Sequence, residues 1–182
     1  FFIEYMGGDF ENDYNTFEKT VMEALDKGLI DDAVIGKDEK EQLNIWGIRE
    51  DVAVLAEEKK FDQQFDISIP VAHIGEVIDK TINELKNCKG VETIFPFGHV
   101  ADGNIHFIIG KDSDDDELKN KINEIIYSNT ELVKGSISAE HGIGLDKKKY
   151  LIKSRSKDEI ELMKLIKKSI DPKNILNPGR VF

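Results

Sequence analysis

The spacing of apolar residues in this chain switches repeatedly between a period of two and a period of about 3.6 residues. Residues 65–70 alternate between apolar and polar side chains, which predicts a half-buried strand. Directly after them, the apolar residues of segment 74–85 recur at helical spacing and predict a helix. A chain that changes period in this way combines strands with helices. We therefore expect an α+β fold with a mainly antiparallel sheet, helices on one face and a small C-terminal helical segment.

The same two patterns locate the remaining elements. They predict strands over residues 1–6, 33–35, 91–97, 105–109 and 133–137, and helices over 17–25, 37–60, 122–126 and 158–170. The helix over 37–60 either continues through Gly47 or breaks there. We expect an α+β substrate or cap domain over residues 1–155 and a C-terminal helix with its tail over 156–182. Because the chain begins with apolar residues and has no initiator methionine, we also expect it to be part of a longer protein whose missing portion lies upstream.

The charge balance limits the classes of partner. The 25 basic and 36 acidic residues leave a net charge of -11, which argues against binding to nucleic acid or to anionic membranes. Cys88 is the single cysteine, so the chain forms no internal disulfide, and its thiol fits a reducing compartment. We expect the cytoplasm, or the mitochondrial matrix in a eukaryote. No apolar run approaches the roughly 20 residues that a membrane-spanning helix needs.

The segment from Gly98 to His106 is the first that could carry chemistry. Its Asp-Gly pair stands between two apolar runs, which is a strong signal for a two-residue hairpin turn. Such a turn centred on Asp102 and Gly103 places His99 opposite His106, with Cβ atoms about 4.5–5.5 Å apart, so that both imidazoles could bind one ion. The alternative is that both histidines only satisfy polar groups of the turn.

A second such segment runs from Gly135 to Gly144, where Glu140 and His141 stand between a short apolar stretch and glycines. Neighbouring side chains on an extended backbone point in different directions, so we expect one to be a metal ligand and the other a base. Two imidazoles and one carboxylate form a three-ligand set that leaves positions open for water or substrate, and zinc, manganese, cobalt and iron all remain candidates. The alternative is that Glu140 caps a helix and His141 lies on the surface.

Other charged residues are less specific. Arg49 carries a guanidinium suited to holding a carboxylate through two parallel hydrogen bonds, although Glu50 and Asp51 are also within reach as ion-pair partners. His73 follows a proline and indicates a structural position near a helix start. The run of three lysines over 147–149 indicates a solvated face.

Taken together, several segments resemble the C-terminal domain of FAD-linked oxidases of the D-lactate, glycolate and D-2-hydroxyglutarate dehydrogenase group. The segments, in chain order, are Ile45-Trp-Gly-Ile-Arg-Glu50, Phe65-Asp-Ile-Ser-Ile-Pro70, Gly98-His-Val-Ala-Asp-Gly-Asn-Ile-His106, Gly135-Ser-Ile-Ser-Ala-Glu-His-Gly-Ile-Gly144 and Asp171-Pro-Lys-Asn-Ile-Leu-Asn-Pro-Gly-Arg180. The resemblance implies an α+β cap domain of a vanillyl-alcohol-oxidase-type enzyme, with the flavin held chiefly by a separate N-terminal domain that this chain does not contain.

The resemblance also implies roles for single residues. These are metal ligands at His99, His106 and Glu140, a catalytic base at His141, substrate contacts at Arg49 and Asn104, and a cofactor contact at Asn177. The implied cofactors are FAD and a divalent metal, with zinc favoured. Two positions depart from the D-2-hydroxyglutarate branch: Gln64 stands where a lysine would hold the distal carboxylate, and Ile108 where an asparagine would be. These departures favour a shorter or less charged acid.

The implied activity is the oxidation of a D-2-hydroxyacid to the 2-oxoacid with hydride transfer to FAD. Arg49 and the metal would hold the substrate, the metal would lower the pKa of its hydroxyl group, and His141 would take the proton. We expect the domain to be inactive without its flavin domain. The alternatives are a metal-dependent hydrolase and a non-catalytic module that binds metal or a small acid. The sequence also allows a homodimer.

Overall fold

The computed structural model describes residues 2–51, 54 and 61–182. The chain forms two compact units, Phe1–Val54 and Leu55–Phe182. Among the described residues, no helix is long and apolar enough to cross a membrane. The division that we predicted between residues 155 and 156 stays a prediction, although a helix does begin at Lys157.

The first unit contains two helices, α1 (Phe10–Asp26) and α2 (Glu39–Glu50). Each begins at an aspartate whose side chain accepts a backbone N–H of the first turn, Asp9 for α1 and Asp38 for α2. None of the residues in either helix is buried. The predicted helix over 17–25 is therefore confirmed as part of α1.

The strands that we predicted over residues 1–6 and 33–35 are wrong wherever the structure describes them, since residues 2–6 and 33–35 form neither strand nor helix. A strand needs a neighbour for its backbone hydrogen bonds, and the described part of this unit contains no strand that could pair with either segment. The predicted helix over 37–60 is confirmed from Glu39 to Glu50 and continues through Gly47, while residues 52–53 and 55–60 lie outside the described part.

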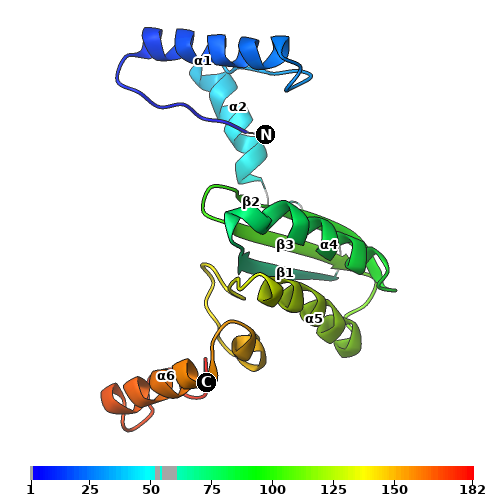
Figure 1. The fold of residues 1–182 in the computed structure, drawn as a ribbon, viewed down its shortest axis with the longest axis vertical. Helices are drawn as coiled ribbons and strands as arrows, with labels where there is room; N and C mark the ends of the chain where they lie inside the picture. The colour runs from blue at the N-terminus through cyan, green and yellow to red at the C-terminus, as the bar shows by residue number, and fades with distance from the viewer. Residues whose placement is uncertain (1, 52–53, 55–60) are drawn as a thin grey trace. The chain divides into compact units, whose positions relative to one another are not determined.

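The second unit is built around a three-stranded antiparallel sheet in the order β1-β3-β2 (Figure 1). Its elements are β1 (Phe61–Ser68), the 3-10 helix η1 (Val71–His73), α4 (Ile74–Lys86), β2 (Val91–His99), β3 (Asn104–Lys111), α5 (Asp116–Leu132), the 3-10 helix η2 (Lys148–Lys153) and α6 (Lys157–Ile170). The predicted strands over 91–97 and 105–109 and the predicted helices over 74–85, 122–126 and 158–170 are confirmed. The predicted strand over 65–70 is confirmed as far as Ser68, where β1 ends.

Two helices of this unit, α4 and α5, cover one face of the sheet. α4 packs on β2, α5 packs on β1, and the two helices contact each other (Figure 1). Because β1 and β2 both pair antiparallel with β3, they run parallel, and α4 crosses between them. This is the split βαβ arrangement of ferredoxin-like folds. It confirms the expected α+β class, with an antiparallel sheet and helices on one face.

The predicted strand over 133–137 shrinks to a single antiparallel bridge between Ser68 and Ser136. The bridge lies beside β1, where a fourth strand of this fold would pair. It brings the segment that follows residue 136 to the end of β1, and this placement builds the candidate site described below.

Alternation along the strands separates a core face from an open face. The core lies between the sheet and the helices and contains buried side chains of β1, β3, α4 and α5, namely Phe65, Ile67, Leu85, Ile105, Phe107, Ile109, Ile122 and Ile126. The residues that alternate with these core residues point to the opposite face of the sheet. They are Gln64, Asp66 and Ser68 in β1 and Asn104, His106 and Ile108 in β3. The candidate site lies on this open face.

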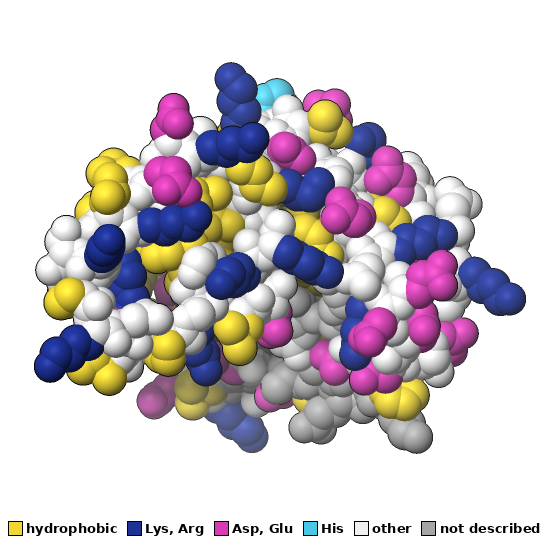
Figure 2. All heavy atoms as spheres, turned by 90° about the horizontal axis from the view of Figure 1, so that it is seen from below, with side chains coloured by type: hydrophobic (Ala, Val, Ile, Leu, Met, Phe, Trp, Pro, Cys, Tyr) yellow, Lys and Arg dark blue, Asp and Glu magenta, His cyan; other side chains and the backbone are white. Residues whose placement is uncertain are grey.

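α6 leaves part of its apolar surface exposed. Leu162, Leu165 and Ile166 are each more than half exposed among the described residues. Figure 2, which views the molecule from the end at which α6 lies, shows apolar side chains interspersed with lysine and carboxylate groups rather than a continuous apolar surface.

Candidate functional site

The register of the β2–β3 hairpin differs from the one predicted. His99 pairs with Asn104 and His106 pairs with Phe97, so the connecting loop contains four residues, Val100–Gly103, instead of two. The predicted pairing of His99 with His106 is therefore wrong. A shift of this size moves each histidine by an even number of positions and keeps both on the same face. Their ring centroids are 6.5 Å apart.

Gly103 explains why the turn is wider. Its N–H donates to the carbonyl of His99 at 3.1 Å, and its own carbonyl accepts the N–H of Ile69 at 2.8 Å. Its φ of +78° is in the left-handed region, and a Cβ at this position would lie 2.1 Å from the carbonyl oxygen of Ile69. The loop is thus fitted to the chain that follows β1, which sequence periodicity cannot reveal.

Asp66 connects the sheet to the segment that carries Glu140 and His141. Its Oδ2 atom accepts the backbone N–H groups of Ala139, Glu140 and His141, each at 2.9 Å. The residue is fully buried. Burial by itself raises the pKa of the Asp66 carboxyl, but the hydrogen bonds from His141 and Glu140, together with the charge of Lys147, hold that pKa below its usual value.

Lys147 supplies the opposite charge for this carboxylate. Its Nζ lies 3.7 Å from Oδ2 of Asp66 and donates to the hydroxyl of Ser138 at 3.0 Å. Burial lowers the pKa of Lys147, while the carboxylate of Asp66 opposes that shift. Only 12% of its side chain is exposed, so the prediction of a solvated face over 147–149 is wrong for Lys147.

His106 lies between two carboxylates. Its Nδ1 is 3.8 Å from Oδ1 of Asp66, and its Nε2 is 3.9 Å from Oε2 of Glu140. Phe97 stacks on the imidazole with ring centroids 5.2 Å apart, and the ring of His141 is 5.7 Å away. The structure therefore brings His99, His106, Glu140 and His141 together at one end of the sheet.

Of two donor sets in this cluster, only the second has all of its potential ligand atoms close enough together in the described structure to hold one metal ion. His99, His106 and Glu140 are the predicted ligands, and the 3.9 Å between His106 Nε2 and Glu140 Oε2 is close to the roughly 3.3 Å that separates two ligands of one tetrahedral zinc ion. The second set is Asp66, His106 and His141, whose potential ligand atoms all lie within 4.8 Å of one another. Imidazole nitrogen and carboxylate oxygen suit zinc in both sets.

The carboxylates of the two sets are held differently. Oδ2 of Asp66 is already occupied by three backbone donors, and Oδ1 faces the Nδ1 atom of His106. Glu140, by contrast, has 61% of its side chain exposed, and its carboxylate is free to turn toward an ion.

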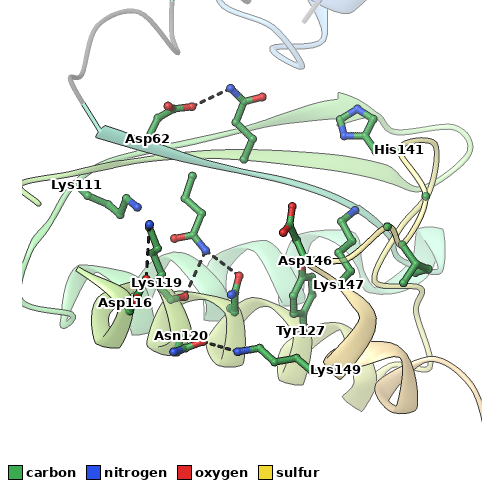
Figure 3. Close-up of a pocket in the computed structure, with 16 residues that line it drawn as sticks. Asp62, Lys111, Asp116, Lys119, Asn120, Tyr127, His141, Asp146, Lys147 and Lys149 are labelled. Atoms are coloured by element: carbon green, nitrogen blue, oxygen red, sulfur yellow. Dashed lines mark hydrogen bonds and ion pairs between the residues drawn. The ribbon is translucent and has the colours of Figure 1, made fainter. Parts of the chain in front are cut away.

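A hollow of about 620 Å³ opens beside His141. Figure 3 shows His141 at one end of it in this view, Lys111 and Lys119 at the other, and Asp146 and Lys147 in between. Its lysines are all engaged, since Lys147 contacts Asp66, Lys149 contacts Asn120, and Lys111 and Lys119 both contact Asp114. The hollow could admit a small polar molecule next to an imidazole.

A smaller hollow of about 390 Å³ is lined by Asn104, Asp102, Glu140 and nearby serines. Asn104 is only 5% exposed, and its Oδ1 has no hydrogen-bond partner among the described residues. An unpaired buried amide oxygen is costly unless a ligand or water uses it, which supports a binding role for Asn104.

The other predicted residues have separate surroundings. Arg49 belongs to the first unit, where its guanidinium pairs with Glu50 at 2.9 Å and lies 5.8 Å from the ring of Trp46. Asn177 is exposed in the tail with a φ of +46°. His73 lies 3.7 Å from Glu76 at the start of α4, in agreement with its structural interpretation.

Comparison with known proteins finds one family and several dehydrogenases that are similar to this chain. The family model for FAD linked oxidases, C-terminal domain, matches residues 1–181. The chain is 36% identical over 181 residues to the mitochondrial D-2-hydroxyglutarate dehydrogenase of Arabidopsis thaliana, covering 99% of this chain and 32% of the relative. It is 35% identical over 175 residues to the D-2-hydroxyglutarate dehydrogenase of Stutzerimonas stutzeri, covering 92% of this chain and 36% of the relative.

A third relative, from Schizosaccharomyces pombe, carries a provisional name as a mitochondrial D-lactate dehydrogenase and is 30% identical over 185 residues, covering 97% of this chain and 35% of the relative. The chain thus spans about a third of the length of these relatives.

Proposed function

The chain belongs to the family of FAD linked oxidases, C-terminal domain, and on that premise we propose that it is the substrate-side domain of a flavin-dependent 2-hydroxyacid dehydrogenase. The complete enzyme would oxidise a D-2-hydroxyacid to the 2-oxoacid. The observation that carries the proposal is the position of His106 between the carboxylates of Asp66 and Glu140, with His141 beside it at an open hollow.

In this proposal, His99, His106 and Glu140 hold one divalent metal ion, with zinc favoured. The ion would supply Lewis-acid polarisation of the substrate hydroxyl group. The 3.9 Å between His106 and Glu140 and the exposure of Glu140 support this ligand set.

His141 is the proposed base. Its backbone N–H is fixed by Asp66, and its imidazole lines the larger hollow. From there it can accept the proton of the substrate hydroxyl as the Cα–H bond breaks. FAD, held by a separate domain, supplies the hydride acceptor.

Arg49 and Asn104 are the proposed contacts to the substrate. The guanidinium of Arg49 is partly exposed and pairs only with its neighbour Glu50 among the described residues, so a substrate carboxylate can replace that partner. Asn104 offers a buried amide with an unpaired oxygen. Asn177 in the tail remains the proposed contact to the cofactor.

A monocarboxylate is the proposed substrate class, in the form of D-lactate, glycolate or a similar short acid. Gln64 faces the same hollow as His141 and donates to Asp62, and the lysines of that hollow already have partners. The described part of the hollow therefore offers no uncommitted cation to a second carboxylate.

The two alternatives, a metal-dependent hydrolase and a non-catalytic binding module, would account only for the cluster of histidines and carboxylates. Neither explains the family match over residues 1–181, so neither is favoured. We propose the cytoplasm as location, or the mitochondrial matrix in a eukaryote, because several relatives are named as mitochondrial proteins. A homodimer and the absence of nucleic-acid partners stay predictions.

The test is flavin reduction in the complete flavoprotein that contains this chain, mixed anaerobically with D-lactate, glycolate or D-2-hydroxyglutarate. We expect bleaching of the flavin absorbance, and we expect His141→Asn to slow it by about 10²- to 10⁴-fold with bound metal retained. The matched control is His73→Asn, an exposed histidine at the start of α4. Wild-type rates in His141→Asn, or no reduction by any 2-hydroxyacid, would contradict the proposal.

A further inference from the structure

We infer that Asp66 is a positioning residue for this site: its carboxylate holds His106 in the tautomer whose Nε2 is free to bind a metal. The inference rests on the proposed function, because it concerns one of the proposed ligands. It assigns a role to a residue that lies in one of the segments resembling the family but that received no role from the sequence, and it gives a physical reason for the geometry of the cluster.

The carboxylate of Asp66 has a fixed orientation. Three consecutive backbone N–H groups, those of Ala139, Glu140 and His141, converge on its Oδ2 atom. Lys147 provides a cation 3.7 Å from the same oxygen, which makes a fully buried negative charge tolerable. With Oδ2 held in this way, Oδ1 can point in only one direction.

Oδ1 of Asp66 is buried and has no hydrogen-bond partner among the described residues. The ring atom it faces is Nδ1 of His106, 3.8 Å away. An unsatisfied buried carboxylate oxygen costs free energy, and a proton on Nδ1 reduces that cost at this distance and removes it when the two groups close to hydrogen-bond range. A neutral imidazole has one N–H, so a proton on Nδ1 leaves the lone pair on Nε2.

Nε2 of His106 faces Oε2 of Glu140 at 3.9 Å. The order carboxylate, imidazole, metal position and second carboxylate is the one found where a histidine ligand donates its other N–H to an acid. Asp66 also accepts the N–H of Glu140, so one buried side chain sets both the tautomer of one ligand and the backbone of another.

The substitution Asp66→Asn separates these effects. The three backbone donors require an acceptor, so the amide oxygen should take the place of Oδ2 and the amide NH₂ the place of Oδ1. The NH₂ group would then donate to Nδ1 of His106 and move the imidazole proton to Nε2, where the metal should bind. The backbone of the loop would keep its anchor while the tautomer changes.

The experiment uses the full chain and two readouts. In metal-free protein, ¹⁵N chemical shifts of His106 should report Nδ1–H in the wild type and Nε2–H in Asp66→Asn. Competition with a chelator should show that the affinity for zinc falls about 10- to 100-fold in Asp66→Asn. The matched control is Asp62→Asn, the same substitution on the same face of β1, which should change neither readout.

The outcomes separate this inference from the proposed function. The Nε2–H tautomer in the wild type overturns the inference, and this measurement needs no variant to fold. Wild-type zinc affinity in a folded Asp66→Asn that has changed its tautomer also overturns it. If the tautomer changes but the wild type binds no metal, the inference stands and the proposed metal site fails. Complete loss of zinc in Asp66→Asn with full binding in Glu140→Ala makes Asp66 a direct ligand, and the inference is then wrong.

Discussion

At the residue scale, the ion pair of Asp66 and Lys147 lies at the centre of the contacts that position the candidate site. Asp66 is fully buried and charged, and it anchors the backbone of Glu140 and His141, while Lys147 offsets its charge. Sequence reasoning found the histidines and Glu140 because imidazoles and a carboxylate near glycines indicate metal or acid–base chemistry. It missed Asp66 and Lys147, since their roles depend on contacts across more than 70 residues. The available signals for Asp66 were its polar position in an alternating strand and its place in the segment from Phe65 to Pro70 that resembles the family.

The first prediction concerns Lys147. We expect Lys147→Met to lower the free energy of unfolding by about 3–5 kcal/mol, because it leaves the buried charge of Asp66 without its cation. Urea unfolding measures this change. Lys148→Met is the control, since Lys148 is exposed, and it should change stability by less than about 1 kcal/mol. Equal effects of the two substitutions would contradict the account of Lys147.

The second prediction concerns pH. The folded state holds the pKa of Asp66 below its usual value of 3.8, so the unfolded state binds this proton more readily. The stabilisation by the charged form is fully present above 3.8 and is lost as the pH falls through the lower folded-state pKa. The difference in unfolding free energy between the wild type and Asp66→Asn should therefore shrink from about pH 5 to about pH 2. A difference that is constant over this range would refute the assignment.

The third prediction concerns the substrate. Gln64→Lys places an ammonium group at the hollow that His141 lines. In the complete flavoprotein, we expect kcat/KM for D-2-hydroxyglutarate to rise about tenfold relative to D-lactate, which corresponds to about 1.4 kcal/mol from one new ion pair. Gln64→Met removes the amide without adding charge and should leave the ratio near its wild-type value. An unchanged ratio in Gln64→Lys would place the distal part of the substrate elsewhere.

At the element scale, residue spacing predicted those helices and strands whose formation depends mainly on their own residues. The apolar spacing that predicted α6 and the alternation that predicted β1 both lie within the element itself. In the structure, α6 also begins with a capping box formed by Ser156 and Glu159. The predicted strands over 1–6 and 33–35 failed because a strand depends on a partner elsewhere in the chain. The predicted hairpin register was wrong for a related reason, since the carbonyl of Gly103 accepts a hydrogen bond from the N–H of Ile69, which lies outside the hairpin.

The fourth prediction tests that contact. Gly103 and Gly142 share a φ of +78°, but a Cβ at Gly103 would lie 2.1 Å from the carbonyl oxygen of Ile69, whereas a Cβ at Gly142 meets nothing within 4 Å. Gly142→Ala should cost only the left-handed backbone penalty of about 1–2 kcal/mol. Gly103→Ala should cost clearly more in thermal or urea unfolding. Similar losses in both variants would show that backbone conformation, not the close approach, requires Gly103.

At the scale of the whole molecule, the fold explains why distant segments form one site. The β2–β3 hairpin carries His99 and His106. The bridge between Ser68 and Ser136, together with the hydrogen bonds of Asp66, brings the segment of Glu140 and His141 to the same end of the sheet. The α+β class and the family followed from the sequence. The sequence did not predict the hollow beside Asn104 or the buried ion pair of Asp66 and Lys147. Both form only when the sheet and the segment after α5 pack together.

The most direct test of the account is an anomalous-scattering map from crystals of the chain loaded with zinc. The account predicts one zinc peak bonded to Nε2 of His106, to Glu140 and to His99, with Asp66 outside the coordination sphere and facing Nδ1. A peak bonded to Asp66, Nδ1 of His106 and His141, or no peak in this cluster, would contradict it.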